Sequence, residues 1–246
     1  MIPPSFDYAR PSSVDEAVAE LARAGEDGKV LAGGQSLLPL LRLRLSYPST
    51  VVDVGRIEQL RGVRLDGDAL VIGAMTTHHD VLHDPLVAEH CPVLAQATAT
   101  VADRAVRNRG TFGGSLAHAD PAADLPAVAL ALDAEMVLAG TGGQRRTVPA
   151  GEFFRDYLET AIGPGELLVE VRVPRLGPGR TRRPSRRWSG SRPRTAGSPR
   201  RPGTPPTTPS PRRTCPAGRT TAGTSPRCSP DARSAAPPPP RELDDS

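Results

Sequence analysis

Leu31-Ala32-Gly33-Gly34-Gln35-Ser36-Leu37 and Gly110-Thr111-Phe112-Gly113-Gly114-Ser115-Leu116 are two glycine-rich stretches that lie about eighty residues apart. Each places Gly-Gly and a small hydrogen-bonding side chain directly before an apolar run. Adjacent glycines allow positive φ and let the backbone approach a ligand closely. Successive N–H groups in such a turn form a concavity that binds anions, and a following helix adds the positive end of its dipole. Two such loops in one domain predict a diphosphate site, although Gly-Gly turns also occur for purely structural reasons.

The residues around the two stretches predict an α+β body with two lobes that divide near Gly55. In the first lobe we expect a helix capped by Ser13, a strand at 29–32, a helix at 37–45 and a strand at 50–54. In the second lobe we expect a hairpin at Asp66-Gly67-Asp68, a helix capped by Thr77, helices at 93–102 and 122–132, and strands at 135–139, 144–148 and 167–173.

Composition changes sharply near Gly179. Residues 1–179 carry sixteen Lys and Arg against twenty-three Asp and Glu, whereas residues 180–246 carry fifteen Arg against four acidic residues. The only large apolar residues of this last segment are Trp188 and Leu243, so it cannot bury enough surface to offset its ordering entropy. We therefore predict a first lobe over 1–55, a second lobe over 56–179 and a disordered tail over 180–246.

Several classes of protein are not expected. No stretch approaches the roughly 18 consecutive apolar residues of a membrane span, and the N-terminus does not resemble a secretory signal, so we expect a cytoplasmic protein. The chain has no G-x-G-x-x-G and no P-loop motif. His79 and His83 are four residues apart on a predicted helix but lack a nearby third ligand, so we expect no metal site. Nor does any residue suggest a nucleophile or a general base, so we expect no catalytic residue.

Five segments occur in the order and spacing of one protein family. They are Ala32-Gly33-Gly34-Gln35-Ser36-Leu37, Ile72-Gly73-Ala74-Met75-Thr76-Thr77, Arg109-Gly110-Thr111-Phe112-Gly113-Gly114-Ser115, Asp120-Pro121-Ala122-Ala123-Asp124-Leu125-Pro126, and Glu166-Leu167-Leu168 ahead of Val171-Arg172-Val173-Pro174. Together they resemble the FAD-binding medium subunit of the molybdenum hydroxylases, the carbon monoxide dehydrogenase and xanthine dehydrogenase group. The resemblance runs from Met1 to about Gly179.

The resemblance implies the two-lobed α+β fold that is shared with vanillyl-alcohol oxidase and p-cresol methylhydroxylase, with FAD between the lobes. It also implies that Ala32–Ser36 and Thr111–Ser115 hold the pyrophosphate through backbone N–H groups and hydroxyls. Asp124 is then expected to bind the adenosine ribose, Leu168 to pack on the flavin ring system, and Thr77 to lie near the cofactor. Family members often carry Asn where this chain has Ser115. The implied cofactor-binding residues are Ala32, Gly33, Gly34, Gln35, Ser36, Thr77, Thr111, Gly113, Gly114, Ser115, Asp124 and Leu168.

The same resemblance implies two partners, a large subunit with the molybdenum cofactor and a small 2Fe–2S subunit. The large subunit oxidises the organic substrate, the small subunit relays the electrons, and FAD passes them to an acceptor. An alternative from another class is a non-catalytic binding module whose basic tail contacts nucleic acid or an acidic partner. We expect no nucleic-acid partner, because the tail has one aromatic residue and no repeating basic motif.

The tail itself departs from the family pattern. Family members continue after Pro174 with a strand-rich segment and a small C-terminal domain, and neither is recognisable here. Arg, Pro, Ser, Thr, Gly and Ala dominate from Arg180 onward, which is typical of GC-rich DNA translated out of frame. We therefore hypothesise a frameshift near codons 175–185, with a genuine basic tail as the rival interpretation.

Overall fold

The computed structural model describes residues 2–175. The predicted tail over 180–246, together with the frameshift hypothesis, lies outside the described residues. Among the residues that are described, no helix is long and apolar enough to cross a membrane.

A three-stranded parallel sheet, here called the small sheet, is formed by the N-terminal part of the chain. Its strand order is β1-β3-β2, with β3 (Thr50–Asp53) between β1 (Asp7–Ala9) and β2 (Gly28–Leu31). Helix α1 (Val14–Ala24) connects β1 to β2, and helix α2 (Leu37–Arg42) connects β2 to β3. The predicted cap of α1 is confirmed, because Ser13 Oγ accepts a hydrogen bond from the backbone N–H of Glu16 at 3.2 Å.

An antiparallel sheet of five strands, here called the large sheet, follows in the order β4-β5-β10-β6-β7. The hairpin predicted at Asp66-Gly67-Asp68 is confirmed, with Gly67 at φ +58° between β4 and β5. The last strand, β10, lies in the centre, and its register against β6 shifts between Leu168 and Glu170. Such a bulge bends a strand and re-aims its side chains. The strands are β4 (Val63–Asp66), β5 (Ala69–Gly73), β6 (Glu135–Ala139), β7 (Arg145–Pro149) and β10 (Leu167–Pro174).

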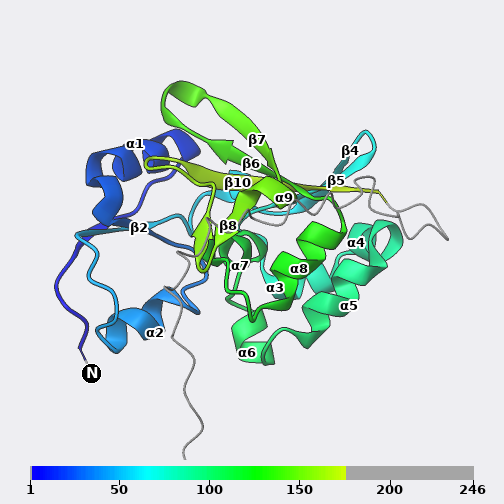
Figure 1. Ribbon diagram of the computed structural model, residues 1–246, viewed down its shortest axis with the longest axis horizontal. Coiled ribbons are helices and arrows are strands. Elements are labelled where there is room, and N and C mark those ends of the chain that lie inside the picture. Colours follow the sequence, from blue (N-terminus) through cyan, green and yellow to red (C-terminus); the bar gives the residue numbers. More distant parts are fainter. Residues whose placement is uncertain (1, 176–246) are drawn as a thin grey trace, which may run out of the picture. The chain divides into compact units, whose positions relative to one another are not determined.

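Helices cover one face of the large sheet (Figure 1). They are α3 (His78–His83), α4 (Pro85–His90), α5 (Pro92–Thr100), α7 (Phe112–His118), α8 (Asp124–Ala131) and α9 (Ala150–Phe153). The short helix α6 (Arg104–Arg107) buries no residue and lies against α3. Two short strands, β8 (Phe154–Asp156) and β9 (Glu159–Thr160), pair after α9, and single 3-10 turns lie at Gly25–Asp27, Glu58–Leu60 and Thr141–Gly143.

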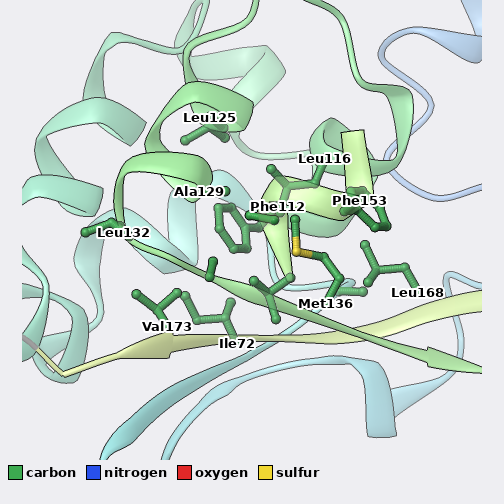
Figure 2. Close-up of a cluster of buried hydrophobic side chains, with 14 of the residues drawn as sticks. Ile72, Phe112, Leu116, Leu125, Ala129, Leu132, Met136, Phe153, Leu168 and Val173 are labelled. Atoms are coloured by element: carbon green, nitrogen blue, oxygen red, sulfur yellow. The ribbon is translucent and has the colours of Figure 1, made fainter. Parts of the chain in front are cut away.

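Each face of the large sheet has its own apolar core. Figure 2 shows the core on the helical face, where Phe112, Leu116 and Met136 pack between the helices and the strands. On the opposite face, α1 and the small sheet share a second core with β6 and β10. The side chains of α1 that enter it are Val14, Ala17, Val18 and Leu21. The second core therefore joins the small sheet to the large one and fixes the positions of the two glycine-rich stretches relative to each other.

Two sequence-based expectations were wrong in detail. The helix expected at 37–45 ends at Arg42. The second glycine-rich stretch, expected as a loop, forms the first turns of α7. By contrast, the predicted cap at Thr77 is confirmed, because Thr77 Oγ1 accepts a hydrogen bond from Asp80 N–H at 3.1 Å. This helix ends at His83, and Asp84 caps the next helix through a 2.8 Å bond from Leu86 N–H. The lobe boundary near Gly55 stays a prediction, while the α+β class is confirmed by the two sheets and their helices.

Candidate functional site

The two glycine-rich stretches meet at a cleft of about 360 Å³. This volume lies within the range of about 300–1,000 Å³ that is usual for small-molecule sites. Both sheets contribute to it, because its wall combines the end of β2, the segment after β5 and the segment before α7. The lining residues are Arg10, Leu31, Ala32, Gly33, Gly34, Leu38, Asp53, Gly55, Arg61, Met75, Thr77, Asn108, Arg109 and Thr111.

Gly33 permits the closest approach between the stretches. A Cβ atom at Gly33 would lie 2.3 Å from the carbonyl oxygen of Arg109 and 2.7 Å from Cα of Gly110. Both neighbours are backbone atoms, so no side-chain rotation relieves the overlap. Gly33 is therefore needed for the contact of one chain segment with another, in addition to any ligand.

The next residues of the first stretch provide hydrogen-bond donors. Gly34 has φ +75°, a conformation that favours glycine. The backbone N–H groups of Gly33, Gly34, Gln35 and Ser36 have no hydrogen-bond partner among the described residues. Successive unpaired N–H groups beside a cleft are suited to an anionic ligand.

The second stretch is arranged differently. The backbone N–H groups of residues 112–115 donate, in this order, to Thr76 O (2.9 Å), Ala74 O (3.0 Å), Thr111 Oγ1 (3.2 Å) and Thr111 O (3.0 Å). Its glycines allow packing: a Cβ at Gly113 would lie 2.5 Å from the Cβ of Ala74. Helix formation and packing thus already use the backbone N–H groups of residues 112–115, and the expectation that this stretch holds a pyrophosphate stays a prediction.

Two threonines stand side by side where the stretches meet. Thr77 and Thr111 form an isolated antiparallel bridge, flanked by a 2.9 Å bond from His78 N–H to Gly110 O. Each threonine caps a helix with its Oγ1. Thr77 Oγ1 accepts a hydrogen bond from Asp80 N–H at 3.1 Å, and Thr111 Oγ1 accepts one from Gly114 N–H. Since each hydroxyl keeps its own proton to donate, both remain available to a ligand in the cleft.

Charged side chains from distant parts of the chain also reach this cleft. Asp53 accepts hydrogen bonds from the Tyr8 hydroxyl and from Gly55 N–H (2.8 Å), and its Oδ2 lies 3.7 Å from Nε of Arg10. The hydrogen bond to Asp53 raises the pKa of Tyr8 above its ordinary value. Arg61 donates to Gly55 O at 2.9 Å. Sequence patterns did not indicate Arg10, Asp53 and Arg61 as site residues, since they lie in separate segments with no shared motif. Arg109 begins the second glycine-rich motif, but the sequence assigned it no role.

A smaller apolar hollow of about 80 Å³ adjoins the cleft and shares Ala32 and Met75 with it. It is lined by Val30, Ala32, Val54, Leu60, Ala74, Met75, Gly113, Gly114, Ala117, Ile162, Glu166, Leu167 and Leu168. At its rim Arg146 forms a two-pronged ion pair with Glu166, with Nε–Oε1 at 2.7 Å and Nη2–Oε2 at 2.6 Å. This pair holds the pKa of Glu166 below its ordinary value. Arg146 also donates to Ala161 O at 2.6 Å, so it fixes both ends of the segment that borders the hollow.

The structure brings most of the predicted site residues together. Ala32, Gly33, Gly34, Thr77 and Thr111 line the cleft, and Gly113, Gly114 and Leu168 line the hollow. Four predicted residues line neither: Gln35, Ser36, Ser115 and Asp124. The carboxylate of Asp124 accepts a hydrogen bond from Thr100 Oγ1 at 3.2 Å. The roles expected for individual residues stay predictions.

The histidine pair does not form part of a larger ligand cluster. The His79 and His83 rings lie 4.3 Å apart between centroids, and His83 Nδ1 lies 2.7 Å from His79 O. Over residues 2–175, no group of three potential metal ligands comes together.

Comparison with known proteins gives matches along most of the described chain. Residues 4–176 match the family described as FAD binding domain in molybdopterin dehydrogenase. The chain is 49% identical over 179 residues to the carbon monoxide dehydrogenase medium chain of Hydrogenophaga pseudoflava, which covers 73% of this chain and 62% of the relative. It is 46% identical to subunit alpha of the 6-hydroxypseudooxynicotine dehydrogenase complex of Paenarthrobacter nicotinovorans, over 72% of this chain and 59% of that subunit.

Solved structures agree with these matches. A carbon monoxide dehydrogenase from Hydrogenophaga pseudoflava aligns with a TM-score of 0.71 at 49% identity, over 73% of this chain and 62% of that one. Quinoline 2-oxidoreductase from Pseudomonas putida 86 aligns with a TM-score of 0.68 at 44% identity, over 71% of this chain and 60% of that one. The chain thus spans about three fifths of the length of these relatives.

Proposed function

The chain belongs to the family of FAD-binding domains in molybdopterin dehydrogenases, and from this membership we propose that it is the FAD-carrying electron-transfer subunit of a molybdenum-containing hydroxylase or dehydrogenase complex. Its partners in this proposal are a large molybdenum-cofactor subunit and a small 2Fe–2S subunit. The relatives bear names such as medium chain and complex subunit, which supports a place in a multi-subunit enzyme. FAD, when bound, supplies the capacity to accept electrons from one redox partner and to pass them to another.

The residues of the site fit FAD. A diphosphate is anionic and rich in acceptor oxygens. Gly33 and Gly34, which line the cleft, have unpaired N–H groups, and Gln35 and Ser36, which follow them in the chain, have unpaired N–H groups as well. Thr77, Thr111 and Arg109 line the same cleft, and residues of these types can add donors and positive charge. The adjoining hollow has an almost wholly apolar wall, which suits a planar ring system. The row of unpaired N–H groups is the observation that carries the proposal.

In this proposal the protein's residues bind and position the cofactor. Gly33 to Ser36 hold the diphosphate, and Leu168 provides an apolar wall for the flavin ring system. The ion pair between Arg146 and Glu166 keeps the segment beside the hollow in place. Asp124 is proposed for the adenosine ribose, because its carboxylate accepts a hydrogen bond from Thr100 at one oxygen and has further lone pairs for the ribose hydroxyls. We propose no catalytic side chain, because electron transfer needs neither a nucleophile nor a general base.

The test is the visible absorbance of bound flavin after the purified chain is mixed with FAD and desalted. We expect the band to be retained by the unsubstituted chain and by Gly67→Ala, and to be lost from Gly34→Ala. The two glycines have similar positive φ values, +75° and +58°, but only Gly34 borders the cleft. Equal retention by both variants, or no retention by the unsubstituted chain, contradicts the proposed site.

A further inference from the structure

The carboxyl ends of the three strands of the small sheet meet beside the cleft. The strands are parallel, and ligands of open α/β sheets usually bind outside such ends. Tyr8 and Arg10 come from the end of β1, Asp53 ends β3, and the first glycine-rich stretch follows β2. Asp53 lies opposite Leu31 in the register of β2 and β3. It therefore stands directly beside the start of that stretch.

Three arginines line the cleft together with one carboxylate. The arginines are Arg10, Arg61 and Arg109, and the carboxylate is that of Asp53. Residues 1–179 carry an excess of acidic residues, so the lining of the cleft is positive in a part of the chain that is negative as a whole. A cleft lined by one sign of charge raises the local concentration of ions of the opposite sign. The charge of the lining therefore favours an anionic ligand.

The partners of Asp53 leave Arg10 loosely held. Asp53 Oδ1 accepts a hydrogen bond from Gly55 N–H at 2.8 Å, and Oδ2 accepts one from the Tyr8 hydroxyl. Nε of Arg10 lies 3.7 Å from the same Oδ2, which is beyond hydrogen-bond distance, and within residues 2–175 this is the one polar contact of the Arg10 side chain. A guanidinium has five N–H donors. Asp53 thus keeps the charge of Arg10 near the cleft while the donors of Arg10 stay available to a ligand.

We propose that Arg10 binds the diphosphate of the cofactor, together with the unpaired N–H groups of the first glycine-rich stretch, and that Tyr8 is a positioning residue that keeps Arg10 available. This rests on the proposed function. Without the Tyr8 hydroxyl, Asp53 can draw the Arg10 guanidinium into a two-pronged ion pair. Arg146 and Glu166 form such a pair elsewhere in this chain. The hydroxyl occupies Oδ2 and so competes with this pairing.

The competing interpretation is a surface ion pair that only joins β1 to β3. The side chains of Arg10 and Asp53 are 42% and 16% exposed, and ion pairs that are exposed in this way contribute little to stability. The two interpretations differ in what the substitution Arg10→Gln changes. Loss of a structural pair lowers the urea midpoint alone, whereas loss of a phosphate ligand lowers the affinity for FAD and the dependence of that affinity on salt.

The test measures the dissociation constant of FAD for the full chain from the change in flavin fluorescence at several salt concentrations, and the urea midpoint of each FAD-free variant. We expect Arg10→Gln to weaken binding by roughly tenfold, as for the loss of one charge-assisted hydrogen bond, and to reduce the salt dependence. Arg23→Gln is the matched control, because it removes the same charge from an exposed arginine on α1 that does not line the cleft. This control is expected to bind FAD as the unsubstituted chain does.

Tyr8→Phe tests the positioning role. Phenylalanine keeps the ring and removes the hydroxyl, so Arg10 is expected to pair with Asp53 and the affinity for FAD to fall by a smaller factor than in Arg10→Gln. In the double variant Tyr8→Phe/Arg10→Gln, the loss of the hydroxyl is expected to have no further effect, because both residues act through the same contact. Additive effects of the two substitutions overturn the positioning role of Tyr8.

The unsubstituted chain reports on the proposed function by itself. If it binds FAD but Arg10→Gln binds FAD as tightly as Arg23→Gln does, the assignment of Arg10 is overturned and the proposed function stands. If it binds no FAD, the proposed function fails, and inorganic pyrophosphate tests Arg10 separately. Pyrophosphate is expected to raise the urea midpoint of the unsubstituted chain and of Arg23→Gln more than that of Arg10→Gln. No difference between the variants with this probe overturns the assignment of Arg10 as well.

Discussion

Replacement of Gly33 by alanine tests how closely the two glycine-rich stretches must approach. The new Cβ would lie 2.3 Å from Arg109 O, 2.7 Å from Gly110 Cα and 2.9 Å from Arg109 C, whereas ordinary contacts begin at 3.4 Å. The stretches must therefore separate by about 1 Å or the backbone must distort. Both options act on main-chain atoms, which are tied to the rest of the fold by hydrogen bonds such as His78 N–H to Gly110 O.

The expected cost follows from the size of this overlap. Insertion of a methyl group into a well-packed region destabilises by about 1–3 kcal/mol, and a contact between two backbone segments belongs at the upper end. A loss of about 3 kcal/mol leaves most domains folded, because their unfolding free energy is roughly 5–15 kcal/mol. The part of the strain that opens the cleft lowers the affinity for FAD, by about tenfold for each 1.4 kcal/mol.

The assay is urea unfolding together with retention of FAD after desalting, with Gly151→Ala as the control. Gly151 lies in α9 without a positive φ, and a Cβ added there would meet no atom within 4 Å. Alanine at this position is therefore expected to be neutral or to stabilise by up to about 1 kcal/mol. Unfolding of Gly33→Ala at the same urea concentration as Gly151→Ala, with FAD retained as well as by the unsubstituted chain, would refute this reasoning.

Three further outcomes are expected. Burial, and then the charge of Arg107, lowers the pKa of His78 from 6.5 to about 4. Between these pH values the unfolded chain binds a proton that the folded chain does not, so stability decreases as pH falls through this window, by at most about 3 kcal/mol. In His78→Leu the urea midpoint is expected to depend less on pH over the same range. Glu166→Gln is expected to remove the stabilisation from the ion pair with Arg146, which is present above the ordinary carboxyl pKa and is lost as pH falls through the lowered pKa of Glu166. This stabilisation is worth under about 1 kcal/mol, because the pair is partly exposed. Arg146→Lys keeps the charge but loses the planar fork, so we expect weaker FAD retention with little change in urea midpoint, and equal retention would argue against a role for this side chain at the hollow.

Local patterns in the sequence were sufficient for the elements that local chemistry decides. The cap at Ser13 and the hairpin at Asp66-Gly67-Asp68 both depend on residues within a few positions of each other, and both are confirmed. The central position of β10 has no such local signature, because its partners β5 and β6 are far away in the chain. The same reason explains why Asp53 and Arg61 were missed: they reach the cleft only after the two sheets pack together.

The two glycine-rich stretches show why a similar pattern does not predict an identical role. Gly34 has a positive φ beside unpaired N–H groups, whereas Gly113 and Gly114 are helical and their N–H groups are bonded within the protein. What separates them is the tertiary contact: Gly113 packs on Ala74, and a Cβ at Gly114 would lie 3.4 Å from Cβ of Ala32 in the first stretch. The second stretch thus supports the first, and the first presents the donors. Substitutions of Gly113 are accordingly expected to act on FAD through the position of the first stretch, and those of Gly34 directly.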